Sequence, residues 1–382
     1  MRIAVVGAGL GGVAAAVGLH RQGHEVSLYE RGAELREAGT GVVIMPNGTR
    51  ALQRLGLDGY VRTLSLPPTD AGLRDWRGRP LLVTDSAQAQ QEIGAAAVVD
   101  RAELHRSLRA PLPDGLVRTG MPVERLDPGP GGVTVISEGR PVETVDAAIA
   151  ADGVRSKLRA HLFPGHPGPR RTGRMDLRGT LPRSPEAAEN GLLAAIMVDR
   201  RTGAGFGLFP LGDDALYWYT DTPQDGPPPS PEEGRREVLA MMAGWHPGVL
   251  KVIADTPAEA IHVDPIVKLA EPLTSYVSGR IALLGDAAHA MSPDLGQGAS
   301  QAFEDAAAVT RHLTGAEPGE VVQRLRRYDA ERRPRANRIL LAAARQSRLT
   351  SLTGAPAWVR DAMLRLVPKR LATRQLAALW HA

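Results

Sequence analysis

The chain has 382 residues, of which 43% are hydrophobic and 23% charged, so it is long enough for two domains and has no shortage of core residues. Its formal net charge is only +4, and basic residues do not alternate with aromatic ones, which argues against nucleic-acid binding. No cysteine occurs, which excludes disulfides, thiolate metal sites and thiol redox chemistry. We therefore expect a globular protein without a metal, and the cytoplasm is a compatible compartment.

The first apolar stretch is a strand leading into a helix rather than a signal peptide. Residues 3–19 are uncharged, but five glycines interrupt them and only Arg2 precedes them. No other segment approaches the length and hydropathy of a membrane span. We expect no membrane span.

The N-terminal elements follow a β-α-β order. A buried strand at 3–6 leads through a glycine-rich turn into a helix that ends near Gln22, and a second strand covers 25–29. A further strand at 42–45 precedes a helix, for which Asn47 is the expected N-cap.

Composition changes along the rest of the chain. Residues 117–151 alternate as strands, and residues 166–265 are richer in proline and aromatic residues. Within them, Gly212-Asp213-Asp214 predicts the turn of a two-strand hairpin. A buried strand at 281–284 and an arginine-rich helical end complete the chain. This order predicts one nucleotide domain assembled from separated segments, with a strand-rich unit inserted between them.

A glycine motif follows the first strand directly. Gly7, Gly9 and Gly12 match G-x-G-x-x-G, which permits a tight turn, close approach of backbone to a pyrophosphate, and close helix–strand packing. Glu30 follows the second strand, where a carboxylate can accept hydrogen bonds from ribose hydroxyls. Arg31 can contact a 2′-phosphate or lie solvated. The motif predicts a dinucleotide site, the alternative being a helix-packing turn, and these residues do not distinguish NAD from FAD.

Two later segments resemble signatures of a known family. "DGVRS" (152–156) and "GDAAH" (285–289) each follow a buried strand. Together with "MPNGTRALQRLGL" (45–57) and "SPDLGQG" (292–298), they are similar to single-component FAD-dependent aromatic hydroxylases of the para-hydroxybenzoate hydroxylase fold. The resemblance covers residues 1 to about 335. It is greatest to the compact urate and hydroxynicotinate hydroxylases.

The resemblance implies an α/β fold with a discontinuous Rossmann-like FAD-binding domain, an inserted mostly-β substrate domain and C-terminal helices. The expected segments are 1–69, 94–165 and 265–340 for the FAD-binding domain, 70–93 and 166–264 for the substrate domain, and 341–382 for the C-terminal helices.

Non-covalent FAD is the implied cofactor. Asp286 would accept hydrogen bonds from the ribityl hydroxyls, its alternative role being an N-cap. The helix that opens at Gly296 would stabilise the anionic reduced flavin. Asp152 and Arg155 would contact FAD and the nicotinamide cofactor, or form an ion pair. The expected cofactor-binding residues are Gly7, Gly9, Leu10, Gly12, Glu30, Arg31, Val42, Arg101, Asp152, Arg155, Gly285, Asp286, Gly296, Gln297, Gly298 and Ala299. Ser300 stands where the family commonly has asparagine.

Aromatic residues cluster in the predicted insert. Five of the chain's fifteen lie between 206 and 219, and the two-residue period places Tyr217 and Tyr219 on one strand face. They line a flat pocket or form the core of the insert. The expected substrate-binding residues are Phe206, Phe209, Tyr217 and Tyr219.

The sequence offers few candidates for chemistry. Tyr217 is the expected substrate-facing hydroxyl, and Pro293 is expected to fix the backbone over the flavin ring. His262 and Asp294 are further acid–base candidates. His289 is expected to be a structural histidine beneath its loop.

The implied activity is FAD-dependent, NAD(P)H- and O2-consuming hydroxylation of a small electron-rich aromatic or N-heteroaromatic compound through a flavin C4a-hydroperoxide. NADPH or NADH would be a transient co-substrate, bound without a second G-x-G-x-x-G motif. The alternatives are another FAD-binding oxidoreductase, or a redox-inactive flavin-binding homologue. We expect a monomer or a homodimer.

Overall fold

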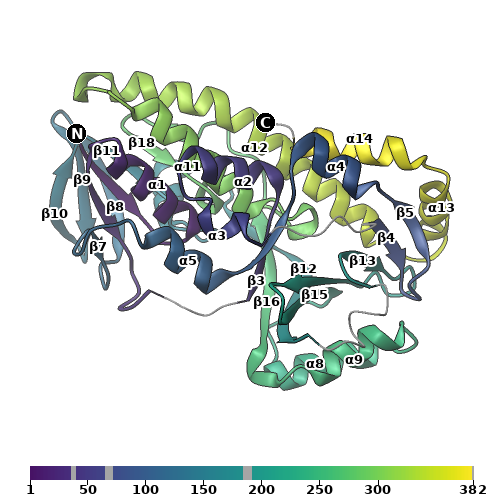
Figure 1. Cartoon of the computed structure of the whole chain (residues 1–382). Coiled ribbons are helices and arrows are strands. Elements are labelled where there is room, and N and C mark those ends of the chain that lie inside the picture. Colours follow the sequence, from purple (N-terminus) through teal and green to yellow (C-terminus); the bar gives the residue numbers. More distant parts are fainter. Residues whose placement is uncertain (36–39, 65–71, 184–191, 381–382) are drawn as a thin grey trace.

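The computed structural model describes residues 1–35, 40–64, 72–183 and 192–380 (Figure 1). Its first unit is built on a six-stranded sheet of order β17-β18-β11-β1-β2-β7. The centre of this sheet is parallel, so strands far apart in the chain lie side by side. Its strands are β1 (Arg2–Val6), β2 (Glu25–Tyr29), β7 (Val117–Arg118), β11 (Ala147–Ala150), β17 (Val277–Ser278) and β18 (Ile281–Leu283).

Helices α1 (Leu10–Arg21) and α11 (Gly298–Leu313) pack against each other through small residues. A Cβ at Gly18 would lie 2.4 Å from the Thr310 hydroxyl, and one at Gly11 would lie 2.9 Å from the Ala302 methyl group. Glycine at these positions therefore allows α11, from the last quarter of the chain, to reach the N-terminal helix.

Smaller elements surround this sheet. β3 (Gly41–Ile44) pairs with β6 (Ala97–Asp100), and β8 to β10 form a separate three-stranded sheet. The remaining elements are α2 (Pro46–Arg54), α3 (Gly59–Arg62), α5 (Arg101–Arg109), β8 (Val123–Gly129), β9 (Gly132–Ser137), β10 (Arg140–Val145) and α6 (Lys157–Leu162).

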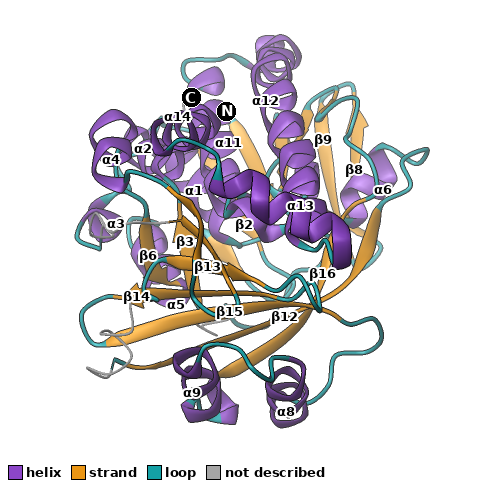
Figure 2. Cartoon of the chain, turned by 90° about the vertical axis from the view of Figure 1, so that its right-hand side faces the viewer, coloured by secondary structure: helices purple, strands orange, loops and turns teal. Residues whose placement is uncertain are grey.

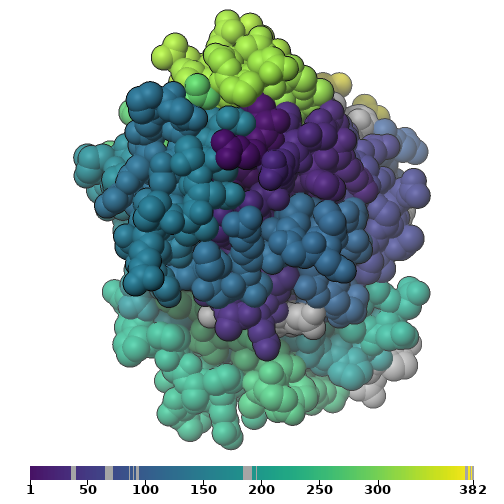
Figure 3. Space-filling model, turned by 90° about the vertical axis from the view of Figure 1, so that its left-hand side faces the viewer, coloured from purple at the N-terminus to yellow at the C-terminus, as the bar shows by residue number. Residues whose placement is uncertain are grey.

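A second unit contains a seven-stranded sheet of order β16-β12-β15-β14-β13-β4-β5. Its strands are β4 (Gly72–Asp75), β5 (Pro80–Val83), β12 (Pro169–Pro182), β13 (Ala195–Val198), β14 (Gly205–Leu211), β15 (Ala215–Pro223) and β16 (Ile261–Leu269). Helices α8 (Pro231–Met241) and α9 (Pro247–Asp255) cover one face of this sheet, and the other face is turned toward the first unit (Figure 2). The space-filling view shows the two units stacked, with the N-terminal segments above the inserted ones (Figure 3). The hairpin predicted around residues 212–214 is confirmed, because β14 and β15 pair across it.

The chain ends in α12 (Val321–Thr350), α13 (Gly354–Arg365) and α14 (Lys369–Trp380). α14 packs against α4 (Ser86–Ile93). The segment boundaries expected at 264 and 340 fall inside β16 and α12, because each is a single continuous element that runs from one unit to the next. The boundary expected at 69 lies outside the described residues. In the part of the chain described, no helix combines the length and apolarity needed to cross a membrane.

Candidate active site

The glycine motif forms the turn between β1 and α1. Gly7 has a φ of +103°, and a Cβ there would lie 2.3 Å from the Ala151 carbonyl oxygen. A Cβ on Gly12 would lie 1.9 Å from the Gly7 carbonyl oxygen. A Cβ on Gly9, by contrast, would meet no atom within 4 Å. Gly7 and Gly12 are therefore required by the turn itself, whereas Gly9 faces open space and permits a ligand to approach the backbone.

Glu30 lies at the end of β2 beside this turn. Its carboxylate accepts hydrogen bonds from the backbone N–H of Ala8 at 3.0 Å and of Gly32 at 2.9 Å. The Ala8 carbonyl is bonded in turn to the His105 imidazole at 2.7 Å. These contacts hold the acid next to the helix N-terminus, as the sequence motif predicts for a ribose-binding carboxylate.

The "GDAAH" segment turns from β18 into the short helix α10 (Asp286–His289). Gly285 adopts a φ of +62° at this junction. The Asp286 side chain is accessible to solvent, although neighbouring protein atoms partly desolvate it. This desolvation raises the pKa of Asp286, while His289, Arg101 and Arg159 act to lower it. An accessible carboxylate is suited to accept hydrogen bonds from ligand hydroxyls.

The "DGVRS" segment is held by side-chain contacts that the sequence did not reveal. Asp152 accepts a 2.6 Å hydrogen bond from the Ser156 hydroxyl and a 3.2 Å bond from the Leu158 N–H. Arg155 is exposed, and the ion pair considered for it with Asp152 does not form within the described chain. Buried Arg159 instead donates to the carbonyls of Val154 at 2.8 Å and Ala287 at 3.0 Å, which joins this segment to the "GDAAH" segment.

The remaining predicted cofactor residues of the N-terminal part occupy different environments. Arg101 starts α5, where burial and neighbouring Arg178 lower its pKa and Asp286 raises it. Its guanidinium therefore lies near the Asp286 carboxylate. Leu10 and Val42 are packed against the apolar core, and Arg31 is exposed.

The "SPDLGQG" segment forms the short 3-10 helix η2 (Pro293–Leu295) and the start of α11. Pro293 is exposed, and Gly296 adopts a φ of +60°. A Cβ on Gly298 would meet no atom within 4 Å, so the first turn of α11 faces open space. Ala299 follows in that turn and is half-buried. The amides of this helix end are placed to attract an electron-rich ligand.

Ser300 has a structural partner. Its hydroxyl accepts a 3.0 Å hydrogen bond from the Met45 N–H, at the N-cap of α2. A Cβ on Gly48 would lie 2.6 Å from the Ser300 hydroxyl oxygen, so α2 and α11 approach closely at this pair. The small serine thus replaces the family asparagine at a tight helix–helix contact. Asn47 is not the N-cap predicted for α2, because its side chain is buried and bonded to Gln297 and Glu304.

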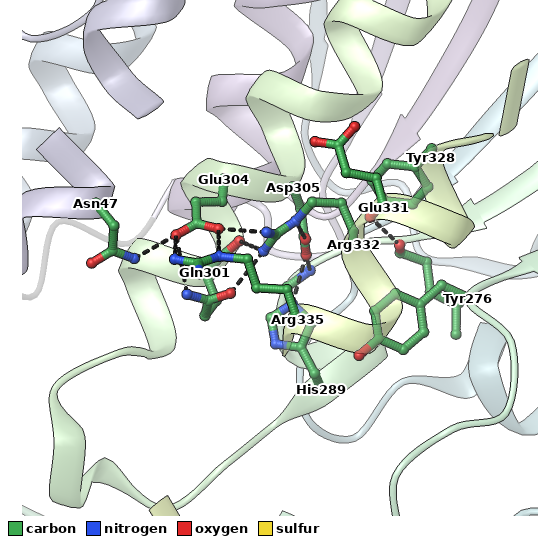
Figure 4. Close-up of polar contacts among 12 residues, drawn as sticks. Asn47, Tyr276, His289, Gln301, Glu304, Asp305, Tyr328, Glu331, Arg332 and Arg335 are labelled. Atoms are coloured by element: carbon green, nitrogen blue, oxygen red, sulfur yellow. Dashed lines mark hydrogen bonds and ion pairs between the residues drawn. The ribbon is translucent and has the colours of Figure 1, made fainter. Parts of the chain in front are cut away.

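A buried polar network lies behind these loops (Figure 4). Arg332 of α12 donates to Asp305 at 2.7 Å and also bonds to Glu304, while Arg335 donates to Glu304 at 2.6 Å. Asp305 in turn accepts from the Gly285 N–H at 2.9 Å. The network thereby joins the "GDAAH" segment, through Asp305, and the first half of α11, through Glu304, to α12.

His289 belongs to this network. Its imidazole is fully buried and lies 2.6 Å from the Asp305 carboxylate. Burial alone would raise the pKa of Asp305, but His289 and Arg332 outweigh it and hold that pKa below its usual range. His289 therefore has the structural role expected from the sequence. Gln297, expected at the cofactor, directs its side chain into the same network through Asn47 and Gln301, which leaves only its backbone for a ligand.

The aromatic cluster divides between the two faces of the substrate sheet. Phe209 stacks with Tyr217 and Tyr219 at centroid distances of 6.5 and 6.2 Å, on the face turned toward β3 and β6. Phe206 is fully buried on the other face, where it stacks with Trp218 beneath α8 and α9. The substrate-binding role expected for Phe206 is therefore wrong, because its place in the strand alternation puts it in the domain core.

Asp176 and Arg178 share the face of Tyr217 and were not recognised from the sequence. They lie on β12, opposite Asp221 and Tyr219 of β15. Arg178 approaches Asp176 to 3.1 Å and also bonds to Asp264. Burial raises the pKa of Asp176 to about 7, and one carboxylate oxygen has no hydrogen-bond partner among the described residues. The alternation of side chains along "RMDLRG", combined with the pairing of this strand with β15, is the signal that would have placed them on the sheet face of Tyr217.

The arrangement fits a flavin dinucleotide. Open backbone at Gly9 and the bound carboxylate of Glu30 suit an adenosine diphosphate half, the accessible Asp286 carboxylate suits a polyhydroxyl chain, and the open first turn at Gly298 suits a ring that carries negative charge. Tyr217 lies on the second unit, where its cluster packs against Val43 of β3 and Val98 of β6.

Comparison with known proteins agrees with this geometry. A family model described as FAD binding domain matches residues 1–343. The chain is 31% identical to aurachin C monooxygenase/isomerase of Stigmatella aurantiaca over 371 residues, which covers 96% of this chain and 94% of that protein. It is 33% identical over 353 residues to 6-hydroxynicotinate 3-monooxygenase of Bordetella bronchiseptica, with 88% and 89% covered. The crystal structure of Klebsiella pneumoniae HpxO with FAD and uric acid superimposes with a TM-score of 0.90 at 28% identity and covers 100% of this chain and 96% of that one. The chain therefore belongs to the FAD-binding-domain family of flavin-dependent aromatic monooxygenases.

Proposed function

We propose that this protein is an FAD-dependent monooxygenase that hydroxylates a small electron-rich aromatic or N-heteroaromatic compound at the expense of NAD(P)H and O2. The observation that carries the proposal is that the backbone is open at the Gly9 turn and at the Gly298 helix end, and that the carboxylate of Asp286, which follows a strand of the same sheet, is accessible to solvent. When bound, FAD supplies the activation of O2 and the transfer of one oxygen atom.

Two carboxylates and a helix end hold the cofactor in this proposal, and a third carboxylate orders a neighbouring loop. Glu30 accepts the adenosine ribose hydroxyls, and Asp286 accepts the ribityl hydroxyls, with Arg101 beside it. Asp152 fixes its loop through Ser156 and Leu158 and brings Arg159 to the "GDAAH" segment. Exposed Arg155 and Arg31 are left for the phosphates of a transient NADH or NADPH.

The aromatic face binds and orients the substrate. Phe209, Tyr217 and Tyr219 form a stacked aromatic cluster in which Phe209 and Tyr217 are buried. Pro293 fixes the backbone at the start of η2. In this proposal these residues exclude water from the reacting ring, which favours transfer of oxygen to the substrate over hydrolytic loss of the activated oxygen species.

Two carboxyl groups of the cleft are suited to take a proton from the substrate hydroxyl. Asp176 has a pKa of about 7, matched to neutral pH, and a free oxygen. The pKa of Asp294 is raised by burial, against hydrogen bonds from Ser292 and Thr350, and one of its oxygens has no partner in the described chain. Asp176 is the better placed of the two for exchange at neutral pH.

The purified protein tests the proposal. We expect the two-band absorption of bound flavin, oxidation of NADH or NADPH that an aromatic substrate accelerates, and a product that incorporates isotopically heavy O2. Protein without flavin would contradict the proposal. Bound flavin with no substrate-dependent oxidation across a panel of phenols and N-heteroaromatics would favour the redox-inactive homologue.

The cellular setting follows from the co-substrates. NAD(P)H is available in the cytoplasm, which we propose as the compartment, and the protein acts as a monomer or a homodimer. Size-exclusion chromatography with light scattering distinguishes these two states.

A further inference from the structure

Helix α13 presents an apolar face to solvent. Val359, Met363 and Leu366 are 59%, 64% and 82% exposed. Their spacing of four and three residues places them on one side of the helix. Figure 1 shows α13 at the edge of the molecule, outside β5. Large apolar side chains in such a row are unusual for a free surface and indicate that something covers them.

Positive charge is concentrated around this face. Residues 352–382 contain five basic residues and one acidic residue, so they account for the net charge of +4 of the whole chain. The acidic residue, Asp361, is buried and bonded to Arg360. Exposed Arg365, Arg370 and Arg374 form no ion pair with an acidic side chain in the described chain.

A basic cavity of about 380 Å³ adjoins the same helix. Its lining residues are Asp75, Trp76, Arg77, Arg79, Arg200, Trp358 and Arg365. The Arg200 guanidinium lies between two indole rings, 4.9 Å from the centroid of Trp76 and 3.3 Å from that of Trp358. Asp75 is buried and accepts hydrogen bonds from the backbone N–H groups of Arg77 and Arg79, and it is the one acidic residue among four arginines in this lining.

The cavity is therefore built for an anion. Arg77, Arg79 and Arg365 are exposed at its rim. The buried indole N–H of Trp76 also has no hydrogen-bond partner among the described residues. Guanidinium groups and an indole N–H are donors suited to phosphate oxygens.

The apolar face, the surrounding arginines and the anion-binding cavity together favour one kind of binding partner. A second copy of the chain would bring the same arginines against one another, which like-charge repulsion opposes. An anionic lipid surface satisfies all three features, because acyl chains cover the apolar row and phosphate headgroups meet the arginines. We propose that the surface made of Val359, Met363, Leu366, Arg365, Arg370 and the Trp76–Trp358 cavity docks the protein on membranes that carry anionic phospholipids.

The test uses the full-length protein and vesicles in a flotation assay. Vesicles of phosphatidylcholine alone are compared with vesicles in which about a third of the lipid is phosphatidylglycerol. We expect binding to the second kind only, weakened by added salt. The double variants Met363→Glu/Leu366→Glu and Arg365→Glu/Arg370→Glu should each lower the partition coefficient at least about tenfold.

A matched control carries the same charge change elsewhere. Arg326→Glu/Arg327→Glu alters two exposed arginines near the other end of α12 and should bind like the wild type. All variants change exposed side chains, and circular dichroism with thermal unfolding verifies that they fold.

Four outcomes would overturn the proposal. The first is no flotation with anionic vesicles, and the second is flotation that the surface variants leave unchanged. The third is a concentration-dependent dimer that Met363→Glu/Leu366→Glu dissociates, which would assign the face to a second copy. The fourth is stabilisation by inorganic phosphate over chloride at equal ionic strength without vesicle binding, which would assign the cavity to a free anion.

Discussion

The carboxylates Asp286 and Asp176 differ in what their surroundings allow. Asp286 is accessible and lies among Arg101, Arg159 and His289, whereas Asp176 is half-buried beside Arg178 with two more carboxylates on the neighbouring strands. The first is placed to accept hydrogen bonds in its ionised form. The second holds its proton up to neutral pH. Residue type alone would not separate these roles.

Asp286→Ala should release FAD without unfolding the protein. The variant loses a charged hydrogen-bond acceptor worth about 1.5–3 kcal/mol, which corresponds to roughly 10- to 100-fold weaker FAD binding. Isothermal titration of the apoprotein with FAD measures the change. Asp114→Ala, at an exposed loop position, is the control and should bind FAD normally. Equal affinity in Asp286→Ala and the wild type would contradict the assigned role.

Asp176→Asn should change how stability depends on pH. The pKa of Asp176 is about 7 in the folded protein, whereas an unfolded aspartate titrates near about 4. Between these values the folded state binds more protons, so Asp176 lowers the free energy of unfolding as pH rises. Asparagine does not titrate, so the free energy of unfolding of Asp176→Asn does not fall with pH for this reason.

Thermal unfolding of the wild type and of Asp176→Asn from about pH 4 to pH 8 measures how the difference in stability depends on pH. The Tm of Asp176→Asn relative to wild type should rise through this window and level off above pH 7. Asp213→Asn, in the exposed β14–β15 turn, should track the wild type. A constant Tm difference would show that the folded carboxyl titrates as it does in the unfolded chain.

At the scale of elements, the β1–α1 turn separates structural from ligand-facing glycines. Gly12→Ala places a methyl group against the Gly7 carbonyl, which should cost about 1–3 kcal/mol of apoprotein stability. Gly9→Ala meets only open space, so the apoprotein should keep its stability while FAD binding weakens. Chemical denaturation and FAD titration of both variants separate the effects. Equal loss of apoprotein stability in the two variants would contradict the distinction.

The sequence predicts elements better than it predicts their partners. The glycine motif, Glu30 and the "GDAAH" turn are local patterns, so their geometry follows from nearby residues. The face of Phe206 depends on register with β15, and the partner of Ser300 lies 255 positions away at Met45. The charged neighbours of Asp176 and Arg178 come from β15 and β16, which follow β12 by many residues. These contacts depend on tertiary structure, so no local stretch of the sequence predicts them.

At the scale of the whole molecule, α12 supports both cofactor loops through Arg332. Arg332→Met leaves Glu304 and Asp305 buried with one cation fewer, which should cost about 3–5 kcal/mol of stability. The loops should loosen together, so hydrogen exchange is expected to increase at Gly285 and at the start of α11. Arg326→Met, exposed on the same helix, should be neutral. Faster exchange confined to α12 would refute the coupling.

Two contacts of the network can form only late in translation, because they join residues far apart in the chain. Asn47 bonds to Glu304, and Glu304 bonds to Arg332. A ribosome that adds about 5–20 residues per second needs roughly 15–60 s to proceed from Asn47 to Arg332. Throughout that interval the N-terminal nucleotide turn exists without the arginine of α12 that joins the later loops to the network. The flavin is therefore acquired only after translation is nearly finished, and a chain released early carries the most recognisable motif of the protein but cannot retain the cofactor.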